Sequence, residues 1–291
     1  MIFSVFSDLN NPDKLAVAKE LLKVLEGTSC KVCFDSKYAK PLEGCDCALL
    51  PYDEMYKACD IAVAVGGDGT TVKTAKNAAV NGKPALGING GRLGFLSAAE
   101  RNELSLVKRV LDGDYSIEER ILLKATVSEN GILREERHCL NDAVVSRGDF
   151  ARLIDVDICS SGREMLTVRA DGIIVSTPTG STAYSLAAGG PILSPDLNCF
   201  VVTSICPHSL MDRSLVVNSK NTLDITVISD VQNNAILTCD GEKPIVVNGK
   251  SKISISLSPY MARLIKIKPD NFYETVKKKI IERLSLIHIS E

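Results

Sequence analysis

Apolar and polar positions follow two different patterns along the chain, and the change falls near residue 115. In the first part, apolar runs without alternation are separated by stretches of helical spacing, the pattern of strands buried on both faces of a parallel sheet. The predicted strands are Ile2–Phe6, Lys31–Phe34, Ile61–Val65 and Pro84–Ile88. Helices are expected between Asn11 and Gly27, from about Thr71 to Val80 and over Leu104–Leu111. Residues 36–58 are predicted to be irregular, and residues 1–115 to form an α/β domain with a doubly wound, Rossmann-like parallel sheet.

From residue 116 to 269 the apolar runs are short, β-branched and separated by Gly, Asn, Asp or Pro, which is typical of an all-β sandwich. One short helix is expected within this region, at about Ser181–Ala188. Helical spacing returns over Asn271–Leu284, with Phe272, Val276, Ile280 and Leu284 on one stripe. Residues 270–283 are therefore predicted to form a C-terminal helix that returns to the first domain. The predicted strands are Leu122–Val127, Ala143–Ser146, Leu153–Cys159, Leu166–Arg169, Ile173–Val175, Leu223–Ile228, Ile236–Cys239, Ile245–Val247, Ile253–Leu257 and Ala262–Ile267.

In the stretch Ile61–Thr74 a buried strand runs directly into glycines and then into a helix with a threonine-rich start. Such a turn attracts phosphate, because glycines allow close approach to the main chain and the first helical N–H groups face the ligand. The candidate phosphate loop comprises Gly66, Gly67 and Thr70, and Thr70 or Thr71 is expected to cap the helix. A carboxylate beside a phosphate site repels the ligand unless the carboxylate does chemistry or holds a cation, so Asp68 is a catalytic candidate. The alternative is that Gly66–Gly69 is an ordinary turn. A second glycine-rich loop, Asn89–Phe95, is expected at the same edge of the sheet.

The stretch Arg169–Ser185 is rich in small and hydroxyl residues. Thr177–Thr182 must turn sharply at Pro178 and Gly180, and it again offers N–H groups to an anion or a polar ring. Tyr184 supplies a flat apolar face for an aromatic base and a hydroxyl group for a hydrogen bond. The alternative is a capped helix docked on the sandwich, with Tyr184 in its core.

Composition narrows the classes of function. The 291 residues include 34 Lys and Arg against 36 Asp and Glu, a net charge of −2, which gives no reason to expect a nucleic-acid or anionic-membrane partner. Apolar runs are shorter than the roughly 18 residues that cross a bilayer, and Met1–Val5 is too short for a secretion signal. A cytoplasmic protein is therefore expected.

The ten cysteines are scattered and are expected to be reduced thiols. Cys30, Cys33, Cys45 and Cys47 are the candidates for a four-sulfur zinc site, but the second pair is too closely spaced for the usual knuckle, so no metal site is predicted. The tail Leu284–Glu291 resembles a translated sequencing adapter and is interpreted as non-native, with a genuine C-terminal strand as the alternative.

Motifs in order over about residues 55–270 resemble those of the NAD kinase family. They are GGDGT at Gly66–Thr70, NGGRLGF at Asn89–Phe95, the pair Asn141 and Asp142, RADGIIVSTPTGSTAYSLAAGGP at Arg169–Pro191, CPHSLMDRSLVV at Cys206–Val217 and CDGE at Cys239–Glu242. GGDGT alone is weak, because lipid kinases and phosphofructokinases resemble it, whereas the block at 169–191 is highly specific.

The resemblance implies transfer of the γ-phosphoryl group of ATP, or of polyphosphate, to the 2′-hydroxyl of the adenosine ribose of NAD, giving NADP. Asp68 would accept the hydroxyl proton. N–H donors or a magnesium ion delivered with ATP would offset its repulsion of the phosphates. The family usually forms homodimers or homotetramers through the β-rich domain.

The resemblance also implies which residues bind NAD. Asn141 and Asp142 would bind the ribose or a base, although the family more often has Glu at the second position, which puts that contact in doubt. Asp171 would accept a hydrogen bond from the nicotinamide amide or the adenine amino group. Lys73 would balance phosphate charge, and a solvated lysine is the alternative. The other implied NAD-binding residues are Gly69, Arg152, Arg169, Thr182, Ala183, Tyr184, Ser185, Leu186, Ala187 and Glu242.

Two other functions stay open at this point. A lipid kinase of the diacylglycerol or sphingosine type shares GGDGT and a β-rich second domain, but it would need an apolar slot, whereas residues 169–191 are small and polar. A non-catalytic NAD(P)-binding sensor is the other alternative, and an intact Asp68 argues against it.

Overall fold

The computed structural model describes residues 1–91, 94–148, 153–209, 211–228, 235–269 and 272–279. The chain divides into two compact units. The first unit comprises Met1–Glu119 and the chain from Ala262 onward, and the second comprises Arg120–Met261. Strands β7 (Ser116–Glu129) and β18 (Ser251–Lys266) contribute residues to both units. The tail 284–291 lies outside the described residues.

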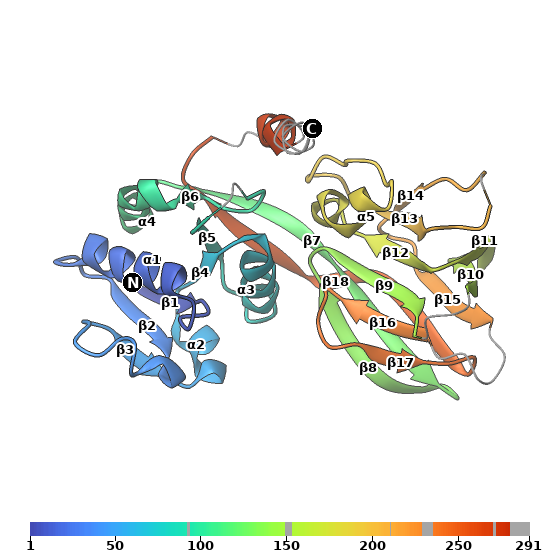
Figure 1. The fold of residues 1–291 in the computed structure, drawn as a ribbon, viewed down its shortest axis with the longest axis horizontal. Helices are drawn as coiled ribbons and strands as arrows, with labels where there is room; N and C mark the ends of the chain where they lie inside the picture. Colours follow the sequence, from blue (N-terminus) through green and yellow to red (C-terminus); the bar gives the residue numbers. More distant parts are fainter. Residues whose placement is uncertain (92–93, 149–152, 210, 229–234, 270–271, 280–291) are drawn as a thin grey trace, which may run out of the picture. The chain divides into compact units, whose positions relative to one another are not determined.

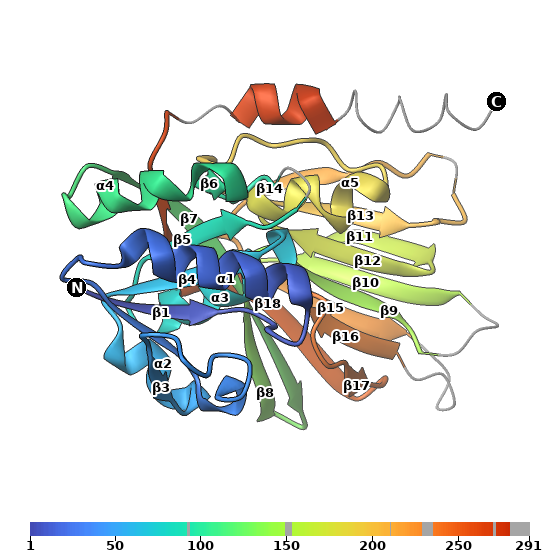
Figure 2. The ribbon, with the colours of Figure 1, turned by 60° about the vertical axis from the view of Figure 1, so that its left-hand side comes forward.

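The first unit is built on a parallel sheet flanked by helices (Figures 1 and 2). Its strand order is β3-β2-β1-β4-β5, with β6 and the end of β18 pairing with β5. The strands are β1 (Ile2–Phe6), β2 (Lys31–Asp35), β3 (Ala48–Leu50), β4 (Ile61–Gly66), β5 (Ala85–Asn89) and β6 (Ala99–Glu100). The helices are α1 (Pro12–Leu25), η1 (Ser36–Tyr38), α2 (Tyr52–Ala58), α3 (Asp68–Val80), η2 (Arg101–Val107) and α4 (Lys108–Leu111).

The central strand β4 is buried along its whole length, because neighbouring strands and helices cover its Ile, Ala and Val side chains. At its end Gly66 pairs with Asn89 of β5, so the two glycine-rich loops leave the sheet at the same edge. Helix α1 begins after Asn11, whose side chain accepts hydrogen bonds from the N–H groups of Asp13 and Lys14. The pairing of β4 with β5 therefore places the phosphate-loop candidate and the second glycine loop side by side.

The second unit consists of two antiparallel sheets. One has the order β14 (Leu215–Asn218), β13 (Cys199–Ile205), β12 (Gly172–Ser176), β9 (Asp142–Arg147), β16 (Ala235–Cys239) and β17 (Ile245–Val247). The other contains β11 (Arg163–Ala170), β10 (Ile154–Ser160), β15 (Leu223–Ile228) and β18, with the hairpin of β7 and β8 (Ile132–Cys139). Apolar side chains of both sheets form one core, among them Val145, Phe200 and Ile158. The predicted α/β plus all-β fold class, with a β-sandwich, is confirmed.

The structure corrects several predicted elements of the two site regions. Helix α3 begins at Asp68 with Gly67 as its N-cap, so neither Thr70 nor Thr71 caps it. The expected helix at Ser181–Ala188 is two short turns, η3 (Thr179–Thr182) and α5 (Tyr184–Ala187), which meet at Ala183. The non-helical backbone of Ala183 (φ −98°, ψ −126°) is what separates them.

Outside the site regions, residues 36–58 were predicted to be irregular but contain β3 and α2. Strands β8, β13 and β14 were not predicted, and the two strands expected over 253–267 are one continuous strand, β18. Residues 272–279 are helical, and the rest of the predicted C-terminal helix lies outside the described residues. In the part of the chain that the structure describes, no helix is both long enough and apolar enough to pass through a membrane.

Candidate active site

Asp68 is the first residue of α3, directly after the end of β4. Its Oδ1 accepts hydrogen bonds from the N–H groups of Phe95 at 2.9 Å and Leu96 at 3.2 Å, and its Oδ2 lies 3.1 Å from the Phe95 N–H nitrogen. The Nζ of Lys279 donates to Oδ2 at 3.1 Å. The positive end of the α3 dipole favours a carboxylate at this position. The side chain is still 34% exposed, so the carboxylate is held in place and remains accessible.

The second glycine-rich loop packs directly on this carboxylate. A Cβ atom at Gly94 would lie 2.6 Å from Asp68 Oδ1, so only glycine fits there without a shift of the carboxylate. At Gly66 a Cβ would lie 2.6 Å from Thr70 Oγ1, whereas at Gly67 and Gly69 it would meet nothing within 4 Å. Close packing inside the protein therefore explains why glycine is needed at positions 94 and 66. Gly67 and Gly69 have open space beside them.

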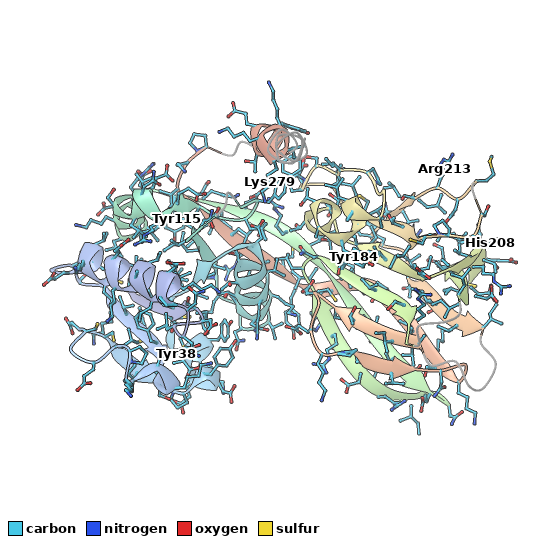
Figure 3. All side chains as sticks on the ribbon, in the orientation of Figure 1. Tyr38, Tyr115, Tyr184, His208, Arg213 and Lys279 are labelled. Atoms are coloured by element: carbon cyan, nitrogen blue, oxygen red, sulfur yellow. The ribbon has the colours of Figure 1, made fainter. Side chains whose placement is uncertain are left out.

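Lys73 does not lie on the Asp68 face of α3. It is five residues further along the helix, a rotation of about 140°, and its side chain is exposed. The cation that contacts Asp68 is Lys279, at the end of the helical residues 272–279, whose side chain is labelled in Figure 3. The sequence pattern predicted the helix at this end of the chain but not the role of its lysine.

In the second unit, Asn141 and Asp142 are fixed by a residue that the sequence analysis did not single out. The carboxylate of Asp240 accepts the N–H groups of Leu140 at 2.9 Å, Asn141 at 2.8 Å and Asp142 at 3.2 Å. The N–H of Asp240 in turn donates to the carbonyl oxygen of Asp142 at 3.0 Å. Three N–H groups that converge on one carboxylate hold the backbone at 140–142 in one conformation.

Asp142 itself is 6% exposed and faces this second carboxylate. Burial, and secondly the negative charge of Asp240, raise the pKa of Asp142 to about 7. Its protonation state therefore changes near neutral pH. The presence of Asp in place of the longer Glu did not by itself predict this change.

The turn at 177–182 is tied to the same segment. Thr177 Oγ1 donates to the carbonyl oxygen of Leu140 at 2.5 Å, and the Thr177 N–H donates to that of Asn141 at 2.8 Å. A Cβ atom at Gly180 would overlap the Asn141 carbonyl group, so this glycine is required by close packing. The buried Arg120 donates to Thr179 Oγ1 at 3.1 Å. The predicted sharp turn is thus present and rigidly braced.

Residues Thr182–Ala187 follow that turn and include both buried and open side chains. Ser185 is buried, and its hydroxyl is 3.1 Å from that of Thr203. Tyr184 is 46% exposed and projects from α5 (Figure 3), so it is not part of the core. The alternative in which Tyr184 packs inside the sandwich is therefore wrong, and its ring is open to a ligand.

The remaining candidates of the second unit have different surroundings. Asp171 pairs with Arg147 (Nη1 to Oδ1, 3.1 Å), which the sequence analysis missed, and Arg169 faces Asp155 on the neighbouring strand at 3.9 Å. Glu242 is partly buried in the turn after Asp240. Arg152 lies outside the described residues.

Among the residues that the structure describes, no group of three or more His, Cys, Asp or Glu side chains is arranged to hold a metal ion. Within these residues, the zinc candidates Cys30, Cys33, Cys45 and Cys47 therefore form no such group. No disulfide joins any of the ten cysteines, all of which lie in the described ranges.

Comparisons with known proteins identify the family to which both parts of the chain are similar. The ATP-NAD kinase N-terminal domain matches residues 6–115, and the ATP-NAD kinase C-terminal domain matches residues 140–267. NAD kinase of Symbiobacterium thermophilum is 37% identical over 272 residues, which are 93% of this chain and 95% of that protein. NAD kinase of Heliobacterium modesticaldum is 41% identical over 230 residues, 78% of this chain and 80% of that protein.

Two solved structures are similar over nearly the whole chain. The NAD kinase from Archaeoglobus fulgidus in complex with ATP is 26% identical, with a TM-score of 0.72 over 96% of this chain and 98% of that one. Yeast NADH kinase complexed with NADH is 24% identical, with a TM-score of 0.85 over 95% of this chain and 86% of that one, and it shows the shared fold. With both domain models matched in order and relatives above one-third identity over nearly full length, the chain belongs to the NAD kinase family.

Proposed function

We propose that this protein transfers the γ-phosphoryl group of ATP to the 2′-hydroxyl of the adenosine ribose of NAD, giving NADP and ADP. The observation that carries the proposal is the Asp68 carboxylate, which is fixed by the N–H groups of Phe95, at the end of the second glycine loop, and of Leu96, and is still accessible. Family membership and the ATP complex of the Archaeoglobus relative support the choice of substrates.

In the proposed reaction Asp68 accepts the proton of the ribose 2′-hydroxyl. The hydroxyl oxygen forms the new bond to the γ-phosphorus, and the bond from that phosphorus to the bridging oxygen of ATP breaks, with its electron pair leaving on ADP. Positioning and charge neutralisation supply most of the rate, because phosphoryl transfer asks little covalent help of the protein. A positioned base adds a factor of about 10² to 10⁴.

The Phe95 and Leu96 N–H groups reduce the electrostatic repulsion between the Asp68 carboxylate and phosphate. They donate to the carboxylate from the backbone, so its negative charge is partly offset before ATP arrives. Magnesium would enter with ATP as part of the substrate and would supply positive charge that offsets the charge of the phosphates.

NAD recognition is proposed for the second unit. Asn141 and Asp142, fixed by Asp240, would bind the ribose or a base, and Tyr184 would offer its exposed ring to a base. Asp171, held by Arg147, would accept a hydrogen bond from an amide or amino group. Further proposed contacts in this unit are Arg152, Arg169, Thr182, Ala183, Ser185, Leu186, Ala187 and Glu242, and Gly69 is proposed as a contact from the first unit. We also propose a cytoplasmic homodimer or homotetramer.

Product analysis tests the proposal. The protein is incubated with MgATP or polyphosphate as donor, and with NAD, NADH or diacylglycerol as acceptor, and products are separated by chromatography. NADP from MgATP and NAD is expected. A phosphorylated lipid, or tight NAD binding without turnover, would instead indicate a lipid kinase or a non-catalytic sensor.

A further inference from the structure

We propose that Lys279 is a positioning residue for phosphoryl transfer, acting through Asp68. Its ammonium group would fix the orientation of the carboxylate that takes the substrate proton, and would balance the charge of that carboxylate as phosphate approaches. The inference rests on the proposed function, because it assigns a partner to the proposed base.

The contacts of Lys279 join it to both parts of the Asp68 site. Its Nζ lies 3.1 Å from Asp68 Oδ2 and 3.9 Å from the centre of the Phe95 ring, well inside the range of a cation–π interaction. Phe95 also donates its backbone N–H to the same carboxylate. Only 20% of the Lys279 side chain is exposed, so this is a confined ion pair rather than a solvated one.

The helix at 272–279 presents Lys279 from its packed face. The partly buried positions are 272, 275, 276 and 279, the spacing of a single helical stripe, whereas 273, 274, 277 and 278 are exposed. The Phe272 ring lies 6.4 Å from the Phe95 ring, centre to centre. Phe95 therefore contacts the helix at both ends of this stripe, which fixes the position of the lysine relative to Asp68.

The two carboxylate oxygens of Asp68 are held by different sets of donors. Oδ1 accepts two N–H groups, from Phe95 and Leu96, which together occupy the two lone-pair directions of a carboxylate oxygen. Oδ2 has the Lys279 ammonium and a share of the Phe95 N–H at 3.1 Å. Each oxygen thus accepts from the Phe95 N–H and from one further donor, and for Oδ2 that donor is the Lys279 ammonium, which holds the carboxylate in one orientation.

The test compares K279M, K279R and the matched control K278M, a lysine on the exposed face of the same helix. Full-length proteins are assayed for NADP formation, for NAD binding and for thermal unfolding. Loss of a charge-assisted hydrogen bond corresponds to about a 10- to 100-fold effect, and K279M is expected to lower kcat by that factor. The KM for NAD stays within about threefold of wild type, K279R recovers part of kcat, and K278M matches wild type. If K279M does not fold, K279Q takes its place.

A double variant separates positioning from general stabilisation. Because Lys279 acts through Asp68, adding K279M to Asp68→Asn is expected to lower kcat by no more than about twofold further. Equal kcat in K279M and K278M would overturn the role of Lys279. So would a double variant in which the separate effects of K279M and Asp68→Asn on kcat multiply. Either result would leave the proposed function in place. A wild-type protein that forms no NADP overturns the proposed function, and the role of Lys279 with it.

Discussion

Asp142 makes the folded protein sensitive to pH, and the substitution Asp142→Asn isolates that sensitivity. Burial first, and the Asp240 carboxylate second, raise the pKa of Asp142 from 3.8 to about 7 in the folded state. Between these two pKa values the unfolded chain has lost the proton while the folded chain keeps it. The free energy of unfolding contributed by this group therefore falls as pH rises from about 4, and it stops falling above about 7.

The size of the effect follows from the shift. One pKa unit corresponds to about 1.36 kcal/mol, so the whole shift is worth about 4 kcal/mol. Between about pH 5 and pH 8 the same linkage gives about 2 to 3 kcal/mol. Asparagine is close in shape to the protonated acid and does not ionise. Asp142→Asn is therefore expected to be more stable than wild type by about 1 to 2 kcal/mol near pH 5 and by about 4 kcal/mol near pH 8, so the gap widens by about 2 to 3 kcal/mol over this range.

Urea unfolding at both pH values, followed by circular dichroism, measures this difference. Asp46→Asn, which changes an exposed aspartate in the first unit, serves as the control and is expected to follow wild type at both pH values. Parallel pH profiles for Asp142→Asn and wild type would refute the reasoning, because they would mean that Asp142 does not retain its proton on folding.

Three further substitutions test separate parts of the site. Gly94→Ala places a Cβ where the Asp68 carboxylate now lies and is expected to lower kcat at least about tenfold, whereas Gly91→Ala, with open space around its Cβ position, should leave kcat unchanged. Asp240→Asn points an amide at one of three N–H donors, so the free energy of unfolding should fall by about 1 to 3 kcal/mol and the KM for NAD should rise; unchanged urea midpoints would contradict this. Tyr184→Ala removes an exposed ring, so it should raise the KM for NAD about tenfold with little change in melting temperature, and an unchanged KM would remove Tyr184 from the site.

Much of the Asp68 region could be predicted from the sequence, because its signals are local. A continuous apolar run, two glycines and a helix start lie within Ile61–Thr74, and each follows from backbone and burial rules. The partners of Asp68 could not be predicted in the same way. Phe95 and Lys279 lie 27 and 211 residues further along the chain, and no pattern in one sequence states which distant groups meet.

The same limit applies in the second unit. Asp240 is an Asp-Gly turn residue with positive φ (48°), which sequence reasoning explains as turn chemistry, but its hydrogen bond to Asn141 spans 99 residues. The missed elements have a different cause. Strand β8 exposes half of its residues and buries only Cys139. Strand β3 and helix α2 have three and seven residues, so none of these elements carries a clear apolar period.

The substitution Asp68→Asn tests the central claim most directly, with NAD binding and NADP formation measured on the same protein. The amide oxygen can still accept the Phe95 and Leu96 N–H groups, so the loop geometry and NAD affinity should be retained. NADP formation from MgATP and NAD is predicted to fall at least about a hundredfold. Near-normal turnover in this variant would contradict the assignment of Asp68 as the group that accepts the ribose proton.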